Sequence, residues 1–414
     1  MIYIGNNEIS NIYIGTDKMY GIYVGDLQIY PTDIILTAIS LDNLVWVTNI
    51  PASGGTATKE NCTYSVIAYY SDGTTVDVTS EATITGSQVI PNTDIEEVHS
   101  AGTLTLTASY SGFTATGNVT VYQEAAVPDF SKKLLTFNIL SAGTIVWKAS
   151  DKYFRKTIDY KLNNGAWASI TSYTGSSAPT ITVKVGDKIQ FRGNNEQYAS
   201  SSSKYNTFGG STAEFEVEGN IMSLINSTDF GTLTALSSDY TFNYLFNECT
   251  GLTSAENLVL PATTLTENCY RCMFQNCSSL TTAPKELPAT KLATYCYSNM
   301  FQYCSSLTTA PKELPATTLA DDCYNNMFRN CKLLTTAPVL PASTLVSWCY
   351  NYMFYGCSSL NYIKCLATNI SAYNCTNNWV ESVASTGTFV KASSMTSWTT
   401  GKKGIPKGWT VQNA

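Results

Sequence analysis

The first thirty residues alternate short apolar segments with turns in a ten-residue repeat. Each copy opens with Ile-Tyr-Ile-Gly or Ile-Tyr-Val-Gly, and the three copies begin at Ile2, Ile12 and Ile22. This pattern predicts short strands joined by glycine-centred turns. So few strands cannot bury both faces of a sheet alone. Residues 1–31 therefore either pack on the next domain or dock on another protein or on copies of this chain.

Apolar and polar side chains also alternate between residues 32 and 123. Turn residues at Ser71-Asp72-Gly73 and Ser111-Gly112 separate the alternating segments. The clearest segments place Tyr64, Val66 and Ala68, and then Leu104, Leu106, Ala108 and Tyr110, on one face of an extended chain. Short alternating strands with regular turns predict a β-sandwich over residues 32–123.

A linker, Glu-Ala-Ala-Val-Pro-Asp at residues 124–129, leads to another region rich in strand signals. Turns at Asn163-Asn164-Gly165 and Gly186-Asp187 divide it. The strand candidates are Leu134–Ile139, Thr144–Lys148, Thr157–Leu162, Thr180–Val185 and Lys188–Arg192. We expect residues 130–218 to form a second domain of the β-sandwich type.

From residue 219 to 376 the sequence is repetitive. A Phe-x-x-Cys motif recurs at steps of 28, 27, 27 and 26 residues, and Cys-Tyr and Leu-Pro-Ala motifs keep the same period. The Phe-x-x-Cys copies begin at Phe246, Phe274, Phe301, Phe328 and Phe354. This period is typical of a solenoid. Because the last turn of a solenoid would otherwise expose its core, we expect residues 377–414 to be a C-terminal cap.

Each repeat carries apolar residues at helical spacing. In Leu319–Cys331 they fall at 319/320, 323/324, 327/328 and 331, as on one face of an α-helix. Thr264 to Glu267 fits a helix-start capping box, and Thr318 to Asp321 is a close variant. An extended run such as Leu307–Pro311 follows each helical segment. The predicted fold class is therefore mainly β, with a C-terminal α/β solenoid of one helix and one short strand per repeat.

The 13 cysteines leave three interpretations open. Most lie on predicted apolar faces, where reduced cysteine acts as a small buried hydrophobe, so a ladder of buried thiols is favoured. Disulfides would fit an oxidising compartment, and an odd count leaves at least one thiol unpaired or bonded to another chain. A metal site is disfavoured, because the single C-x-x-C, Cys269 and Cys272, is not kept in later repeats, which carry Asn299, Asn326 or Tyr352 instead.

These motifs carry several resemblances. Tyr70–Thr79 resembles a stretch of bacterial immunoglobulin-like domains, and Phe242–Cys375 resembles the BspA-like leucine-rich repeats of bacterial surface proteins and of phages infecting gut Bacteroidota. Ile158–Trp167, Gly186–Asn195 and Gly219–Leu224 look like the β unit that precedes such repeats, and Asn378–Val380, Thr386–Val390 and Gly404–Val411 look like their closing cap. The Ile-Tyr-x-Gly opening is similar to N-terminal segments of structural proteins in such phages. The resemblances imply adhesion or recognition.

Composition narrows the function further. The chain has 24 Lys and Arg against 31 Asp and Glu, a net charge of −7, and no basic run, which disfavours nucleic acid as a partner. The single histidine, His99, sits in a polar segment, which excludes most His-based catalysis. The sequence contains no segment of 18 or more apolar residues, so no transmembrane helix is predicted. The N-terminus lacks signal-peptide features, so we expect assembly in a cytosol.

Variable positions within a solenoid tend to face solvent, so variable aromatics are candidates for binding. They are Tyr295, Tyr303, Trp348, Tyr352 and Tyr355. Rigid aromatic side chains are favoured anchors for sugars and for protein partners. The alternative interpretation is that neighbouring turns half-cover these rings.

We therefore expect a non-enzymatic virion protein, such as a head or tail fibre or a decoration protein, with no catalytic residues, metal or cofactor. Residues 1–31 would dock on other virion proteins, and the solenoid would meet a host glycan or protein. We also expect a homo-oligomer; fibres are often trimers, although no pattern here defines a threefold axis. The alternatives are a bacterial surface adhesin, which needs an export signal, and a glycan-cleaving spike, which needs paired carboxylates across a cleft.

Overall fold

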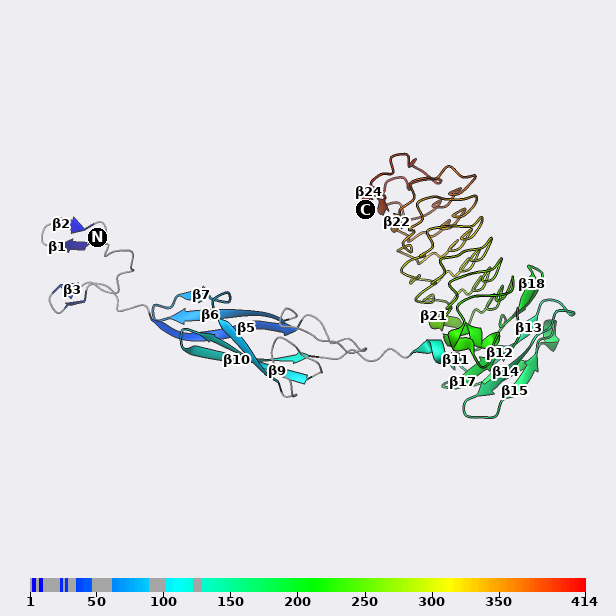
Figure 1. The fold of residues 1–414 in the computed structure, drawn as a ribbon, viewed down its shortest axis with the longest axis horizontal. Coiled ribbons are helices and arrows are strands. Elements are labelled where there is room, and N and C mark those ends of the chain that lie inside the picture. Colours follow the sequence, from blue (N-terminus) through cyan, green and yellow to red (C-terminus); the bar gives the residue numbers. More distant parts are fainter. Residues whose placement is uncertain are drawn as a thin grey trace. The chain divides into compact units, whose positions relative to one another are not determined.

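The computed structural model describes residues 35–46, 62–88, 102–121 and 129–414, together with four short strands within residues 2–28 (Figure 1). The chain divides into two compact units, Met1–Pro128 and Asp129–Ala414. The described residues are mainly β, as expected, and contain no α-helix. Their helical elements are the 3₁₀ turns η2 (Phe130–Lys132), η3 (Gly175–Ser177), η4 (Ile221–Leu224) and η5 (Phe230–Thr232).

Two copies of the ten-residue repeat form strand pairs. In the first copy β1 (Ile2–Ile4) pairs antiparallel with β2 (Asn7–Ile9), and in the third copy β3 (Tyr23–Val24) pairs with β4 (Leu27–Gln28). These strands were predicted from the apolar spacing. The second copy lies outside the described residues.

The remainder of the first unit contains two three-stranded antiparallel sheets. One consists of β5 (Leu36–Trp46), β6 (Cys62–Tyr70) and β7 (Thr75–Asp77); the other consists of β10 (Phe113–Val121), β9 (Gly102–Tyr110) and β8 (Thr83–Gln88). The alternating residues bury as predicted, since Val66, Leu106 and Ala108 have no exposed surface. Val66 and Ala108 belong to the same apolar cluster, so both sheets contribute to one core.

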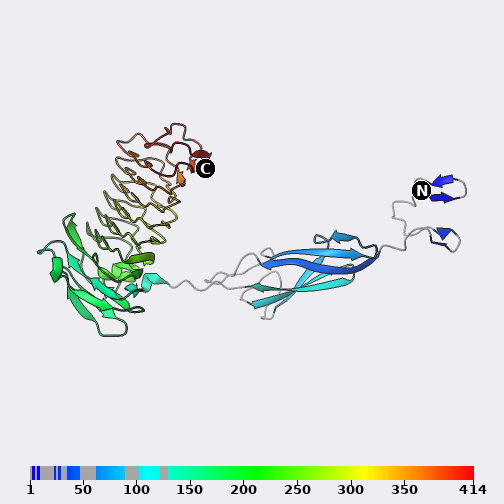
Figure 2. The same ribbon diagram turned by 180° about the vertical axis from the view of Figure 1, so that it is seen from behind.

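The second unit begins with a six-stranded sheet (Figure 2). Its strands, in spatial order, are β15 (Ala168–Thr171), β14 (Thr157–Leu162), β17 (Lys188–Arg192), β11 (Leu135–Ile139), β20 (Phe215–Asn220) and β21 (Leu252–Val259). Smaller sheets pair β12 (Gly143–Val146) with β16 (Thr180–Val183), and β13 (Lys148–Ala149) with β19 (Lys204–Thr207) and β18 (Ala199–Ser201). β14 and β17 match their predicted bounds. The β20–β21 pairing is parallel and links the sheet directly to the repeats.

Each repeat forms one coil, which we define as one pass of the chain through a turn segment and two extended sides. Successive coils stack in parallel (Figure 1). One ladder of bridges joins Ser254, Thr282 and Thr309, and another joins Thr264, Lys291 and Thr318. The stack ends on a parallel sheet of β22 (Tyr362–Cys365), β23 (Thr388–Lys391) and β24 (Thr410–Asn413).

The predicted helix in each repeat was wrong, because the segment is a chain of tight turns. In the copy after Thr266, the N–H groups of Arg271, Met273 and Gln275 donate to the carbonyl three residues earlier. The residues between them donate to the next coil, as Tyr270 does to Cys296 (2.9 Å) and Phe274 to Met300 (2.9 Å). An α-helix satisfies all such donors within itself. Here half of them bind the neighbouring coil, so the capping boxes start no helix.

The turn segments have a strict period of four residues. A residue with positive φ recurs at every fourth position, for example Asn268, Cys272 and Asn276, with φ of 57°, 55° and 61°. Apolar pairs between these positions point inward, as Cys269 with Tyr270 and Met273 with Phe274 do. A four-residue period is close to the 3.6 residues of a helical turn, which is why the sequence pattern suggested a helix.

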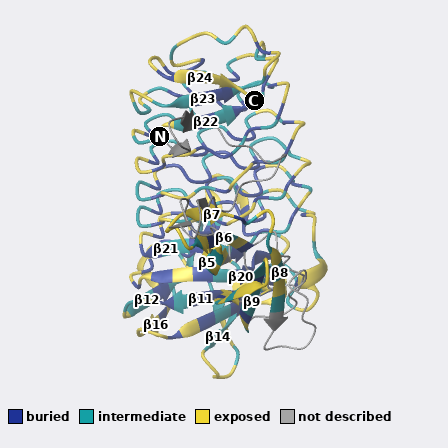
Figure 3. Cartoon of the chain, turned by 90° about the vertical axis from the view of Figure 1, so that its left-hand side faces the viewer, coloured by how far each residue is buried: buried dark blue, intermediate teal, exposed yellow. Residues whose placement is uncertain are grey.

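Buried residues recur in every coil (Figure 3), and among them two ladders of stacked rings run through the coils. In the Phe ladder, centroids of successive rings are 5.3 to 5.7 Å apart; its members are Phe246, Phe274, Phe301, Phe328 and Phe354. The parallel ladder contains Phe242, Tyr270, Tyr297, Tyr324 and Tyr350. Both end on Trp379. Phe246 also contacts Phe137 and Phe208 of the β region, so one core extends from the sheet to the cap.

Twelve of the thirteen cysteines lie inside the coils, where they form a third ladder, and Cys62 lies in β6 of the first unit. All thirteen are buried free thiols, as the favoured interpretation predicted. In four coils the Cys thiol donates to the carbonyl of the ladder Phe one coil earlier, at 3.0 to 3.1 Å; the donors are Cys277, Cys304, Cys331 and Cys357. Burial raises the pKa of Cys272 to about 11 and that of Cys296, Cys357 and Cys365 to about 12. The fold therefore keeps these side chains protonated.

Replacing Phe301 by Ala should remove one rung from the Phe ladder. The buried ring leaves a cavity that its stacked neighbours cannot fill, so we expect a loss of about 3–5 kcal/mol in the free energy of unfolding. Urea denaturation of the full chain measures this. Leu333→Ala is the control, because Leu333 is 50% exposed and should change stability by about 0.5 kcal/mol or less. Equal effects of the two substitutions would contradict the role of the ladder.

The thiol ladder also predicts an alkaline loss of stability. Unfolded thiols lose their protons near their ordinary pKa, whereas the buried thiols keep theirs, so the stabilisation is complete below about pH 8.5 and falls as the pH rises toward the folded values. Each such thiol weakens folding by about 1.4 kcal/mol per pH unit in that range. Urea denaturation under reducing conditions from pH 7 to 10 should show a steep decline. Cys304→Ala removes one of these thiols, so the loss of unfolding free energy per pH unit should be smaller by the contribution of one proton. An unchanged slope would contradict this explanation.

Candidate binding face

The positive-φ residues of the stacked turns form three columns along the coils, and all of them except the buried Asn268 and Cys272 reach the surface. We call them the first, second and third columns, and the surface they make the column face. The first column contains Tyr240, Asn268, Tyr295, Asp322, Trp348 and Asn374; the second contains Tyr244, Cys272, Asn299, Asn326, Tyr352 and Asn378; the third contains Glu248, Asn276, Tyr303, Asn330, Gly356 and Ser382. Successive coils therefore present the same backbone position again and again, with side chains that vary.

Aromatic residues occupy column positions at a conformational cost. Asn fills seven of the eighteen positions, as expected, because Asn tolerates left-handed backbone better than most residues. Tyr and Trp have no such advantage, and a left-handed conformation costs them on the order of 1 kcal/mol each. Yet six of the positions are Tyr or Trp. Strained residues that local propensity does not explain are a recognised mark of functional surfaces.

Four of the five predicted binding aromatics belong to these columns. Tyr303 is the most exposed, at 42%, while Tyr295, Trp348 and Tyr352 are half-buried. Tyr355 is not in a column but lies beside Tyr352, with ring centroids 5.4 Å apart. The structure thus brings Tyr352 and Tyr355 together and leaves Tyr303 separate, in the third column.

Three further aromatics on this face were not predicted. Tyr240 and Tyr244 lie in the first coil, before the first Phe-x-x-Cys copy, and aligning the coils on Phe246 would have found them. Tyr373 is 69% exposed and lies edge-to-face against Trp348 at 5.4 Å. It directly precedes Asn374, so its place in the period was the signal available in the sequence.

The column tyrosines reach along the stack to the following coil. The hydroxyl of Tyr352 accepts a hydrogen bond from Asn378 at 2.8 Å. The hydroxyl of Tyr295 donates a hydrogen bond to the carboxylate of Asp322, and the pKa of Tyr295 is raised by burial and then by the charge of that carboxylate. Burial likewise raises the pKa of Tyr244, which hydrogen-bonds Cys272. Each ring therefore spans two coils, and a smaller residue follows it in the column.

Two arginines and one ladder of amide side chains hold the rows between the columns. The guanidinium of Arg271 lies 5.5 Å from the ring centroid of Tyr295, and that of Arg329 lies 5.2 and 5.0 Å from those of Tyr352 and Tyr355. These are cation–π contacts, which fix the orientation of the rings. The side chains of Asn325, Asn351 and Asn377 hydrogen-bond in series from coil to coil. The rings are thus presented on a rigid polar support.

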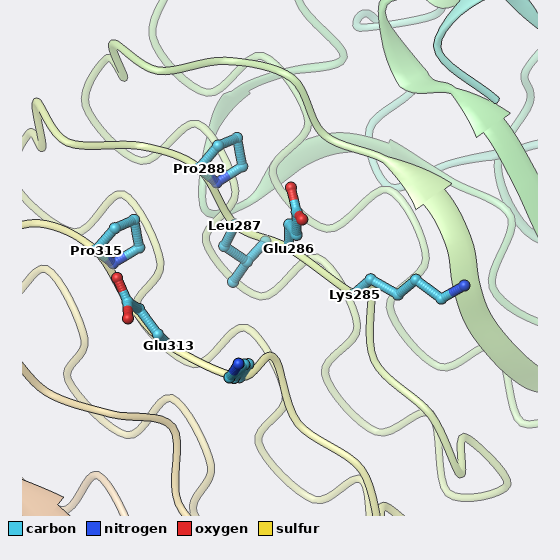
Figure 4. Close-up of a pocket in the computed structure, with 7 residues that line it drawn as sticks. Lys285, Glu286, Leu287, Pro288, Glu313 and Pro315 are labelled. Atoms are coloured by element: carbon cyan, nitrogen blue, oxygen red, sulfur yellow. The ribbon is translucent and has the colours of Figure 1, made fainter. Parts of the chain in front are cut away.

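A hollow of about 310 Å³ lies at a different corner of the coils (Figure 4). Pro288 and Pro315 of successive coils border it, and the buried Leu287 lies beneath them. Its charged lining residues are Lys285, Glu286, Lys312 and Glu313. The hollow occurs where two coils carry Pro-Lys-Glu-Leu-Pro, whereas the next coil has the shorter Pro-Val-Leu-Pro. Lys285 pairs with Glu256 at 3.4 Å, so part of this charge is already balanced within the fold.

A larger hollow, of about 610 Å³, lies on the outer face of the six-stranded sheet. Lys132, Lys133 and Lys188 line it together with Glu218 and with amide side chains, including Gln190. It borders the start of the second unit. Its lysines favour an anionic ligand, in contrast to the first column, beside which Asp239, Glu267 and Asp321 are exposed carboxylates.

The remaining sequence candidates are His99 and the pair Cys269 and Cys272. His99 lies outside the described residues. Within the described ranges, no three His, Cys, Asp or Glu side chains lie close enough together to hold a metal ion, and Cys269 and Cys272 are both buried in the stack. No helix among the described residues has the length and apolarity that a membrane crossing requires. No protein-family model, curated protein or solved structure matches this chain.

If the column aromatics serve binding and not folding, Tyr303→Asn should not destabilise the chain. Asn relieves the backbone strain, and little burial is lost, so we expect the free energy of unfolding to stay equal or rise by up to about 1 kcal/mol. Asn330→Ala, in the same column, is the matched control and should cost about 1 kcal/mol. Both values come from urea denaturation. A clear loss in Tyr303→Asn would assign Tyr303 to the fold.

Proposed function

We propose that this chain is a non-enzymatic virion protein, a head or tail fibre or a decoration protein, that presents its stacked coils for recognition. In this proposal residues 32–123 are an immunoglobulin-like sandwich and residues 219–376 a leucine-rich-repeat solenoid. The observation that carries the proposal is the set of strained Tyr and Trp residues on the column face. They give up backbone stability on a surface whose rings are held in place by Arg271 and Arg329.

Rigid, partly exposed aromatics suit recognition because they lose little conformational freedom on binding. The stack adds rigidity, since each coil is hydrogen-bonded to the next along its whole turn segment. A non-catalytic role is supported by the sequence, which has one histidine, His99, and places the repeat carboxylates in turns. The face therefore supports binding of a host glycan or protein.

Residues 1–31 are proposed as the attachment segment. Their ten-residue repeat forms the short strand pairs β1–β2 and β3–β4, and such small pairs are marginal alone. Docking on the particle or on sister chains would complete their packing. This part of the proposal includes assembly as a homo-oligomer, for which a trimer is one form.

A bacterial cell-surface adhesin is the second candidate. It would use the same β regions and the same column face, and it differs in where the chain is found. The motif resemblances apply to both classes, so location is the property that separates them.

Particle association tests the proposed function. Mass spectrometry of gradient-purified phage particles should find the chain enriched over the host outer-membrane fraction. Particles produced with a chain that lacks residues 1–31 should not contain that shortened chain. Urea denaturation of the shortened chain should still show the unfolding transition of the second unit. Enrichment in membranes would favour the adhesin, and unchanged incorporation of the shortened chain would contradict the docking role.

A further inference from the structure

We propose that the column face binds an extended, uncharged β-1,4-linked glycan lying along the first column, with alternate sugars stacked on Tyr240, Tyr295 and Trp348. This inference rests on the proposed recognition function and names its ligand class. It depends on three observations: the alternation of the column, its spacing and its charge.

The first column alternates strictly. Its aromatic residues, Tyr240, Tyr295 and Trp348, occupy every second coil, and the coils between carry Asn268, Asp322 and Asn374. The backbone register is the same at each step: the N–H of Tyr240 donates to the carbonyl of Glu267, and that of Asn268 to the carbonyl of Thr294. The three rings therefore repeat at two-coil intervals along one line.

The interval matches the geometry of an extended β-linked chain. Core rings of neighbouring coils lie 5.3 to 6.0 Å apart, so the column aromatics recur at about twice that distance. In a β-1,4-linked chain of hexopyranoses each sugar is turned over relative to the one before, and one sugar is about as long as one coil step. The same sugar face thus recurs at every second sugar, as the rings do. An α-1,4-linked chain curls and loses this register.

The charge of the column selects a neutral glycan. The residues directly before the column positions include the exposed carboxylates Asp239, Glu267 and Asp321, and Asp322 lies in the column itself. Carboxylates accept hydrogen bonds from sugar hydroxyls and repel acidic sugars. The one basic residue beside the column, Arg271, donates to Asn268 and lies over Tyr295, so it is already engaged.

The test is isothermal titration of the full chain with defined oligosaccharides. Cellohexaose and chitohexaose represent the β-1,4 class, their trisaccharides test length, and maltohexaose is the α-1,4 control. We expect at least one β-1,4 hexasaccharide to bind about tenfold or more tightly than its trisaccharide, because it reaches further rings. Maltohexaose should bind at least tenfold more weakly.

Substitution by Asn tests one ring at a time, because Asn tolerates the left-handed backbone at these positions. Tyr295→Asn and Trp348→Asn should each lower affinity about fivefold to tenfold, as expected for the loss of an aromatic anchor. Tyr153→Asn is the matched control, since it makes the same Tyr-to-Asn change at a residue that is 82% exposed and lies outside the columns, and it should leave affinity unchanged. Circular dichroism checks that each variant is folded. A hexasaccharide no better than its trisaccharide, equal binding of maltohexaose, or equal loss in Tyr153→Asn would overturn the inference.

A second measurement separates this inference from the proposed function. Binding of the labelled full chain and of Trp348→Asn to intact host cells is measured beside the titrations. If no β-1,4 oligosaccharide binds but the cells capture the chain in a Trp348-dependent way, the glycan class is wrong and recognition stands. If β-1,4 glycans bind but the chain is absent from purified particles, the inference stands and the virion role is wrong.

Discussion

Every second backbone N–H of the turn segments donates to the following coil, and the rest of the repeat structure depends on this pattern. It forces a four-residue period, because each tight turn must end in a left-handed residue before the next begins. The period then sends pairs of apolar side chains inward and places one left-handed residue in a column. The ring ladders, the thiol ladder and the column face are three consequences of the same hydrogen-bond register.

The β region and the cap close the two ends of the hydrogen-bonded stack of coils. Carbonyls of the first coil accept hydrogen bonds from the β region, as Thr241 does from Tyr198 and Leu245 from Phe208. Phe137 and Phe208 cover the first rung of the Phe ladder, and Trp379 covers the last. An open end would expose both aromatic surface and unpaired backbone groups. The stack, its base and its cap therefore stabilise one another as one core.

Sequence reasoning succeeded where the pattern has one physical meaning. Alternation over Leu104–Ala108 specifies a strand with one buried face, and the strand formed. It failed where two structures share nearly the same period: apolar pairs every four residues, as at Cys323 and Met327, fit a helix and a chain of turns alike. Only the left-handed residues distinguish them, and Asn326 followed by Asn330 was the available signal. Tyr295 and Trp348 obscured this signal, because aromatic residues are not typical of a left-handed backbone.

The two-coil reach of the column tyrosines has a consequence for how such a stack can change in length. One coil is the unit of folding, since any coil supplies the donors and ladder rungs that its neighbour needs. The surface, however, repeats over two coils, because a ring such as that of Tyr295 extends to Asp322 of the next coil. In the first column, duplicating a single coil would set two large rings in succession or two small residues together. That column therefore keeps its alternation only when coils are gained or lost in pairs.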